Sequence, residues 1–420
     1  MKIAIVGTGI SGMVAAYLLH RDHEITVFEA ADYIGGHTNT IDVEMDGRTY
    51  AIDTGFIVFN DWTYPNFIAL LNRLGVASQP SDMSFSVTCE RTGLEYNGTN
   101  LNTLFAQRRN LLRPSFYRMI RDILRFNRDS PELLTQLEPG PSLGSYLAAH
   151  RYSSAFIDHY IVPMGAAIWS ADHATILRLP ARYLVQFFKN HGMLSVEHRP
   201  TWRVVQGGSR RYAEQLVAPF RDRIHLKSPV DSISRYPDFV EVRARFTGQD
   251  CRALRFDHVI IAAHSNQALA MLADPSPSEQ DILGAIRYQE NEAVLHTDAS
   301  LLPRRKLAWA AWNYHLLPTQ PDRAVVTYHM NRLQRLSSSH EFCVTLNHTR
   351  AIDPAKILRR ITYHHPVYSP DAVAAQKRHG AISGINRTSY CGAYWGFGFH
   401  EDGVKSALAV CTPFGKDLTS

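Results

Sequence analysis

The chain has 420 residues, of which 45% are hydrophobic and 20% charged, as is ordinary for a folded protein of two or three structural units. Its net charge of +5 is local, because residues 107–128 hold seven arginines and one aspartate, which leaves 37 basic and 38 acidic residues elsewhere. A nucleic-acid-binding protein shows a broader basic surface, so we expect no nucleic-acid partner. Five cysteines without a C-x-x-C pair argue against a disulfide framework and favour the cytoplasm.

The chain opens with a pattern typical of a β-α-β unit. Residues 2–6 predict a buried strand, residues 12–20 a helix and residues 24–28 a second strand. The seventeen uncharged residues from Ile3 to Leu19 also resemble a signal peptide or a short membrane span. Glycines interrupt this run and a strand follows it, so we expect neither a cleaved leader nor a span.

A glycine-rich turn joins the first strand to the helix. The sequence Gly7-Thr8-Gly9-Ile10-Ser11-Gly12 matches G-x-G-x-x-G, in which the glycines allow a tight turn and a close approach of the backbone to a pyrophosphate. Glu29 stands seventeen positions after Gly12, where a carboxylate can accept hydrogen bonds from a ribose. These residues predict a dinucleotide site.

The rest of the chain changes character twice. Residues 76–204 carry helical periodicity with proline breaks and predict an inserted helical region, after which a helix is expected over 211–220. Strands are expected at 223–226, 240–246, 259–263, 293–297, 324–330 and 342–346. A glycine-rich turn then leads into a last helix that ends near residue 410. This order predicts α/β structure around the insertion and a second sheet beside it.

Several segments resemble one family in order along the chain. The segment Glu29-Ala30-Ala31-Asp32-Tyr33-Ile34-Gly35-Gly36-His37-Thr38 resembles the E-x-x-x-x-x-G-G-R segment of the flavin-containing amine oxidase and phytoene desaturase superfamily. Five later segments resemble it as well, at residues 53–56, 205–209, 228–233, 256–263 and 392–407. The resemblance implies an α/β fold with a Rossmann-like FAD-binding domain of the GR2 type and a mixed α+β substrate domain. The FAD-binding domain would comprise residues 1–75, 205–275 and 380–420, and the substrate domain residues 76–204 and 276–379.

The resemblance also implies FAD as the cofactor and a set of residues that hold it. These are Gly7, Gly9, Ile10, Ser11, Gly12, Glu29, Ala30, Gly35, Gly36, His37, Thr38, Thr54, Gly55, Phe56, Val230, Ala262, Gly403 and Val404. The last helix would face the flavin with its N-terminus and stabilise negative charge on the reduced ring. We expect no metal site, because the twenty histidines include no H-x-x-x-H pair.

The chain departs from the family pattern at three places, and the last two of them count against simple amine oxidation. His37 stands in place of an arginine, residues 289–296 hold no lysine, and Phe399 replaces a tyrosine of the aromatic cage. His296, His400 and Glu401 are the polar residues expected nearest the flavin, where one could act as a base or orient the substrate. Glu401 could instead be a structural acid at the start of the last helix. Nearby aromatic residues could line an apolar tunnel or fill the core: Tyr390, Tyr394, Trp395, Phe397 and Phe399.

A narrower resemblance points to a lipid substrate. Residues 295–298, 309–314 and 398–403 resemble a bacterial branch of FAD-binding proteins often encoded beside cyclopropane-fatty-acid-synthase-like methyltransferases. It implies an oxidoreductase that desaturates or oxidises a fatty acyl or related apolar substrate by hydride transfer to flavin N5, with a methyltransferase as a partner. Three alternatives stay open: an amine oxidase that releases hydrogen peroxide, a carotenoid- or porphyrinogen-type dehydrogenase, and a non-catalytic flavoprotein that presents acyl chains to the methyltransferase.

Residues 108–128 allow two interpretations. At 100° per residue, apolar side chains share one face of a helix and arginines the other: Phe116, Ile120, Ile123 and Leu124 against Arg118, Arg121, Arg125 and Arg128. Such a helix either lies on an anionic membrane or packs its apolar face on the core and exposes its arginines. In the first case the protein would be cytoplasmic and peripheral to the inner face of the membrane.

Overall fold

The computed structural model describes residues 1–135, 140–246, 250–319 and 323–418. A five-stranded sheet in the order β10-β2-β1-β14-β20 is parallel throughout. Its strands are β1 (Lys2–Val6), β2 (Glu24–Phe28), β10 (Ile224–His225), β14 (His258–Ile261) and β20 (Thr388–Tyr390). A sheet of this kind is covered on both faces, which explains why β1 and β14 are almost continuously apolar.

Different structures cover the two faces of this sheet. On one face, α1 (Ile10–Leu19) packs against α10 (Arg210–Val217) and α15 (His400–Cys411), and α2 (Pro65–Arg73) lies beside α15. Ile3 and Ile5 of β1 point into this layer, whereas Ala4 and Val6 point to the other face. There an antiparallel sheet of β11 (Val230–Arg235), β12 (Val240–Ala244) and β13 (Arg252–Phe256) lies with α11 (Ser265–Met271) and α12 (Pro277–Gly284). The predicted α/β fold with a Rossmann-like domain is confirmed.

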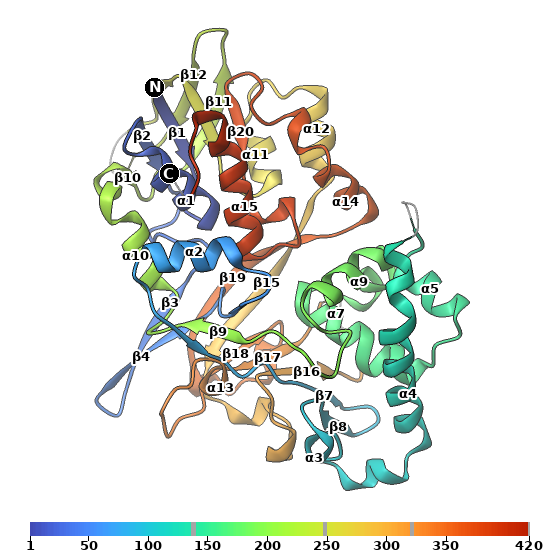
Figure 1. Cartoon of the computed structure of the whole chain (residues 1–420). Helices are drawn as coiled ribbons and strands as arrows, with labels where there is room; N and C mark the ends of the chain where they lie inside the picture. Colours follow the sequence, from blue (N-terminus) through green and yellow to red (C-terminus); the bar gives the residue numbers. More distant parts are fainter. Residues whose placement is uncertain (136–139, 247–249, 320–322, 419–420) are drawn as a thin grey trace.

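A seven-stranded sheet forms the other large part of the molecule, in the order β19-β15-β18-β17-β16-β7-β8. Its strands are β7 (Phe85–Cys89), β8 (Leu94–Asn97), β15 (Arg287–His296), β16 (Trp312–Leu316), β17 (Val326–His329), β18 (Cys343–Leu346) and β19 (Ile357–Val367). Figure 1 shows this sheet below the parallel one, with the long pair β15 and β19 rising between them. Two of its strands come from the region expected to be helical, so that region is mixed rather than purely helical.

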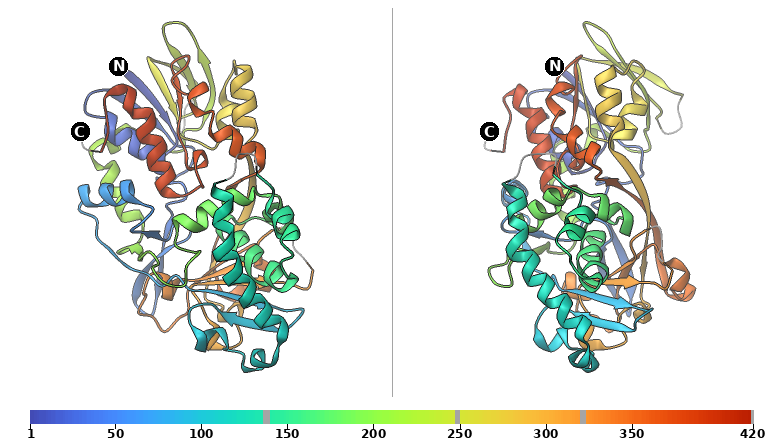
Figure 2. Two further views of the ribbon diagram at one scale, coloured as in Figure 1. Left: turned by 45° about the vertical axis from the view of Figure 1, so that its right-hand side comes forward. Right: turned by 90° about the vertical axis from the view of Figure 1, so that its right-hand side faces the viewer.

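The helices of the insertion form one group beside the seven-stranded sheet (Figures 1 and 2). They are α3 (Leu101–Leu104), α4 (Pro114–Asp129), α5 (Leu143–Ala149), α6 (Ser154–Phe156), α7 (Val162–Trp169), α8 (His173–Arg178) and α9 (Ala181–Asn190). In α4, Phe116 is 3% exposed, and Ile120 and Ile123 also pack on the core. The apolar face of α4 therefore turns inward, as in the second of the two interpretations, and only Leu124 of that face is exposed.

Short sheets connect the two large parts. β3 (Thr40–Met45) pairs with β4 (Arg48–Asp53), and β9 (Trp202–Val205) lies between β5 (Phe59–Asn60) and β6 (Ser78–Pro80). At the end of β4, the buried Asp53 carboxylate accepts hydrogen bonds from Thr40, Ser209 and Gln334. Three distant segments therefore meet at one side chain. Among the described residues, no helix is both long and apolar enough to cross a membrane.

Candidate cofactor and substrate cavity

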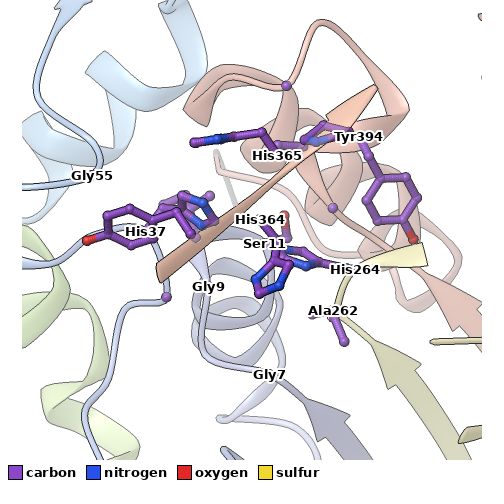
Figure 3. Close-up of a pocket in the computed structure, with 18 of the residues that line it drawn as sticks. Gly7, Gly9, Ser11, His37, Gly55, Ala262, His264, His364, His365 and Tyr394 are labelled. Carbon is purple, nitrogen blue, oxygen red and sulfur yellow. The ribbon is translucent and has the colours of Figure 1, made fainter. Parts of the chain in front are cut away.

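A cavity of about 720 Å³ lies between the parallel sheet and the seven-stranded sheet (Figure 3). Fifteen of the residues predicted to act on or hold FAD line it: Gly7, Gly9, Ile10, Ser11, Glu29, Ala30, Gly35, Gly36, His37, Thr54, Gly55, Phe56, Val230, Ala262 and His400. Six others do not line it: Gly12, Thr38, Gly403, Val404, His296 and Glu401. The order of motifs along the chain thus brings most of its residues to one place, as a single binding site requires.

Each glycine of the first motif has a different local role. Gly7 has φ +104°, and a Cβ there would lie 2.8 Å from the carbonyl oxygen of Ala262, the residue that follows the neighbouring strand β14. A Cβ at Gly12 would lie 2.0 Å from the Gly7 carbonyl oxygen, so this glycine serves the packing of α1 and not the cavity wall. A Cβ at Gly9 would meet no atom within 4 Å. The space beside Gly9 is therefore open for a ligand.

Glu29 directly follows β2 and is held in place by hydrogen bonds. Its carboxylate accepts from the Thr8 N–H at 2.8 Å, the Thr8 hydroxyl at 2.6 Å and the Ala31 N–H at 2.8 Å. The turn after β1 and the end of β2 thereby fix each other. The carboxylate is presented at the cavity wall, where ribose hydroxyls could reach it.

A group of histidines lines the same cavity. The ring of His37 lies 6.0 Å from His264 and 5.4 Å from His365, and it stacks on Tyr363 at 4.8 Å. Burial lowers the pKa of His37 to about 4 and those of His264 and His365 to about 3, so these rings are neutral near pH 7. Figure 3 shows His37 and His264 on either side of Gly9. No lysine or arginine appears among the described residues that line the cavity.

His400, at the start of α15, lies in the cavity wall, but its side chain already contacts other residues of the protein. Its Nε2 lies 2.8 Å from the Tyr212 hydroxyl and 3.0 Å from the Thr38 hydroxyl, and its ring stacks on Phe56. Burial holds the pKa of His400 well below its usual range. This geometry suits a neutral ring that supports the floor of the cavity, and it provides a weak base.

Glu401 and His296 do not line the cavity, although both were expected near the flavin. Glu401 is 3% exposed and accepts hydrogen bonds from the backbone N–H groups of Asn66 and Phe67, at the start of α2. This is the structural alternative considered for it. His296 is the last residue of β15, where its Nε2 lies 2.7 Å from the Thr345 hydroxyl and its Nδ1 accepts from the Asp298 N–H. The structure therefore gives neither residue access to the cavity.

Gly403 and Val404 act through helix packing. A Cβ at Gly403 would lie 2.6 Å from a side-chain methyl of Ile10 and 3.0 Å from the hydroxyl of Ser11, so the glycine lets α15 lie close against α1. Val404 is fully buried in the same layer. Close packing of these helices brings both of their N-termini to the cavity.

The part of the cavity nearest the seven-stranded sheet is apolar and aromatic. It is lined by Ile168 and Trp169 of α7, Trp312 of β16, Tyr328 of β17, Leu346 of β18, and Phe397 and Phe399 before α15. Of the five aromatic residues expected there, Tyr394 also lines the cavity, whereas Tyr390 and Trp395 do not. Trp312 and Tyr328 were missed as site residues, because only the pairing of β16 with β17 places them together.

The residues present fit a bound FAD. The first turn of α1 has no side-chain cap, so its N–H groups are free to bind a pyrophosphate. Buried polar atoms without a partner also occur in the wall, namely His37 Nε2, Trp312 Nε1 and the hydroxyl group of Tyr368. Such atoms are costly unless a ligand satisfies them. Among the described residues, no group of three or more His, Cys, Asp or Glu side chains could hold a metal ion.

Comparison with known proteins agrees with this site. The family model described as flavin containing amine oxidoreductase matches residues 10–412. An L-amino-acid oxidase from Pseudechis australis is 20% identical over 327 residues, which cover 70% of this chain and 57% of that protein. A zeta-carotene desaturase from Solanum lycopersicum is 36% identical over 76 residues, or 18% of this chain and 12% of that protein. The matches thus span little more than half of these relatives at most.

Solved structures share the fold over nearly the whole chain. Cyclohexylamine oxidase from Brevibacterium oxydans aligns with a TM-score of 0.71 and 18% identity over 99% of both chains. A fatty acid isomerase from P. acnes aligns with a TM-score of 0.68 and 17% identity over 98% of both chains. The predicted superfamily, its fold and FAD as its cofactor are confirmed by the family match and these structures.

Proposed function

Because the chain belongs to the family of flavin-containing amine oxidoreductases, we propose that it uses FAD to dehydrogenate an uncharged apolar substrate. A fatty acyl chain in ester or amide linkage is the substrate class that suits the cavity best. The observation that carries this proposal is the aromatic and aliphatic wall beside the seven-stranded sheet, which holds no Asp, Glu, Lys or Arg among the described residues.

Charge decides between substrate classes. An ammonium group would lose its hydration in this part of the cavity without meeting a carboxylate, and a free carboxylate would meet no cation there. Among the described residues, the two carboxyl groups that line the cavity are Glu29, directly after β2, and Asp231 of β11, and both lie in segments expected to hold the dinucleotide. A neutral acyl chain has no such cost, and its methylene groups gain about 0.8 kcal/mol each on burial.

The chain's own residues would bind the substrate, orient it and shield it from water. FAD, when bound, would supply the two-electron acceptor that the dehydrogenation needs. The aromatic walls exclude water from the reacting carbon. The indole Nε1–H of Trp312 is buried without an acceptor, and it would donate a hydrogen bond to a carbonyl oxygen of the substrate. The N-terminus of α15 supports negative charge beside the cavity.

Amine oxidation is the second candidate, and the family description favours it. The same walls would require an amine to enter uncharged. The fold itself does not discriminate, because it occurs both in a cyclohexylamine oxidase and in a fatty acid isomerase.

Anaerobic reduction of the bound flavin tests the proposal. Phospholipids with unsaturated or methylated acyl chains, a carotenoid, a porphyrinogen and a panel of amines are each mixed with the purified holoprotein, and the visible absorption of the flavin is followed. We expect bleaching by the lipids and not by the amines. Bleaching by amines alone would establish the second candidate. Lipid binding with no reduction by any compound would point to the non-catalytic role, with presentation of acyl chains to a methyltransferase.

A matched pair of variants tests the orientation of the substrate. Trp312→Phe removes the unpartnered donor. We expect KM for the lipid to rise about tenfold, because one hydrogen bond to the substrate is lost, and the flavin content to stay the same. Trp309→Phe is the control, because Trp309 Nε1 donates to the Pro303 carbonyl and does not line the cavity. Equal kinetics of the two variants would remove Trp312 from substrate recognition.

A further inference from the structure

An exposed apolar and basic face lies where α3, the 3-10 helix Arg108–Leu112 and the start of α4 meet, at the lower right in Figure 1. Of the thirteen large hydrophobic side chains exposed in the described residues, five lie between residues 101 and 124. They are Leu101, Leu111, Leu112, Tyr117 and Leu124. Leu112 is 88% exposed and Leu101 is 76% exposed, so these side chains project into solvent and do not edge the core.

A second segment extends this face. The 3-10 helix Lys306–Ala308 packs against α3 and β8, and its Leu307 is 39% exposed. Arg304, Arg305 and Lys306 are exposed beside it. The face therefore combines two parts of the chain that are about 200 residues apart. We call it the Arg-Leu face.

Positive charge is in excess on the Arg-Leu face. Residues 91–128 contain eight arginines and two carboxyl groups, Glu95 and Asp122. Both carboxyl groups are buried, and they pair with Arg305 and Arg125. Arg108 and Arg113, by contrast, donate to neutral oxygens of the chain. Two further carboxyl groups border this segment: Glu90 is exposed, and Asp129 pairs with Arg128 at 2.6 Å. The arginines still outnumber the carboxyl groups.

We propose that the Arg-Leu face docks on an anionic lipid surface. Leu111 and Leu112 project between Arg109 and Arg113, so the leucines can enter the acyl region while the guanidinium groups stay at the level of the phosphates. Tyr117 and Leu124 are seven residues apart on α4 and continue the same side of the helix. The docking surface is thus the exposed rim of α4 with the preceding turn, and the core-packed residues Phe116, Ile120 and Ile123 take no part.

Vesicle cosedimentation of the full-length holoprotein tests this proposal. Vesicles of phosphatidylcholine alone are compared with vesicles that contain about 30% phosphatidylglycerol, at about 0.05 M and about 0.5 M NaCl. We expect binding to the anionic vesicles at low salt and its loss at high salt. Arg118→Gln with Arg121→Gln should weaken binding about fivefold per arginine. Leu111→Ser with Leu112→Ser should weaken it at least tenfold, from the loss of buried apolar area.

Matched controls use exposed residues far from the Arg-Leu face. Val196→Ser with Leu358→Ser and Arg287→Gln with Arg360→Gln change side chains that are also exposed, and both should bind like the unchanged protein. Flavin content and the thermal midpoint verify that every variant folds. A probe on Leu112→Cys, in a Cys251→Ser background, should shift to a less polar emission with anionic vesicles, whereas a probe on Val196→Cys should not.

Three results would overturn the proposal. The first is an unchanged protein that stays in the supernatant with anionic vesicles. The second is a leucine variant that binds as strongly as the unchanged protein. The third is a leucine variant that turns a dimer into a monomer without vesicles, because the Arg-Leu face would then be an interface between two copies of the chain.

Discussion

Gly9 and Gly12 show that two glycines of one motif can have different roles, one in ligand binding and the other in packing. Gly9 faces open space in the cavity, whereas Gly12 lies against the backbone of Gly7. Gly9→Ala should therefore leave the flavin-free protein as stable as before but raise the Kd for FAD at least tenfold, because the new methyl group occupies the ligand's space. Gly12→Ala should lower the free energy of unfolding by about 1–3 kcal/mol or more, because the backbone must move.

The two glycine variants are told apart by paired measurements. Thermal unfolding of the flavin-free proteins reports the packing of α1, and titration with FAD reports the cavity. A loss of stability in Gly9→Ala as large as that in Gly12→Ala would contradict the separate roles.

The motifs and the family resemblance predicted much of the cofactor side of the cavity wall, but of the three candidate catalytic residues only His400 lines it. The glycines, Glu29 and His37 could be found because their chemistry depends on local sequence order. His296 could not be placed, because β15 is ten residues long and only one of its ends reaches the cavity. Tyr288 lines the cavity near that end, and His296 lies eight residues further on, roughly 27 Å along an extended strand.

At the scale of elements, Glu401 joins α15 to α2. Its carboxylate accepts from two backbone N–H groups at the start of α2 and from the side-chain amide of Asn66 at 2.6 Å. Glu401→Ala should lower the free energy of unfolding by about 1–3 kcal/mol, because it leaves buried donors without an acceptor. Flavin reduction per bound flavin should stay unchanged. Glu401→Gln keeps one acceptor oxygen and should lose less stability.

Stopped-flow reduction of the flavin checks the role of Glu401. A Glu401→Ala protein that folds normally but reduces its flavin much more slowly would return this residue to the reaction.

The elements themselves were predicted where local pattern was strong. The first strand, its helix and the second strand were expected within two residues of β1, α1 and β2. The expected strand at 293–297 is only the last part of β15, because its first half is polar and is held by pairing with β19. β7 and β8 were missed inside a helical region, since pairing with β16, more than 200 residues away, defines that edge of the sheet.

At the scale of the whole molecule, three distant segments each bring histidine to the cavity. His37, His264 and His365 meet there where no lysine or arginine lines the wall. Burial holds their pKa values at about 3 to 4 in the free protein. The phosphates of FAD would raise them, because negative charge favours the protonated ring. Between the free-protein pKa values and the raised ones, the bound state holds more protons than the free state, so affinity for FAD should rise as pH falls toward about 4.

FAD titrations of the apoprotein at several pH values test this linkage. The Kd should change by at most about tenfold per pH unit for each proton taken up. His37→Arg supplies a fixed charge, so it should bind FAD more tightly at pH 8 and show a flatter dependence on pH. Identical pH profiles of the two proteins would exclude a role for His37 in proton uptake.

The order of strands in the parallel sheet also has a consequence for biosynthesis. β1 lies between β2 and β14, and roughly 250 residues separate β1 from β14 along the chain. At about 5–20 residues per second, a ribosome needs more than ten seconds to make them. During that time one edge of β1 has no neighbour. The cavity wall itself runs from Val6 to His400, so capture of the cofactor can follow only when the chain is almost complete.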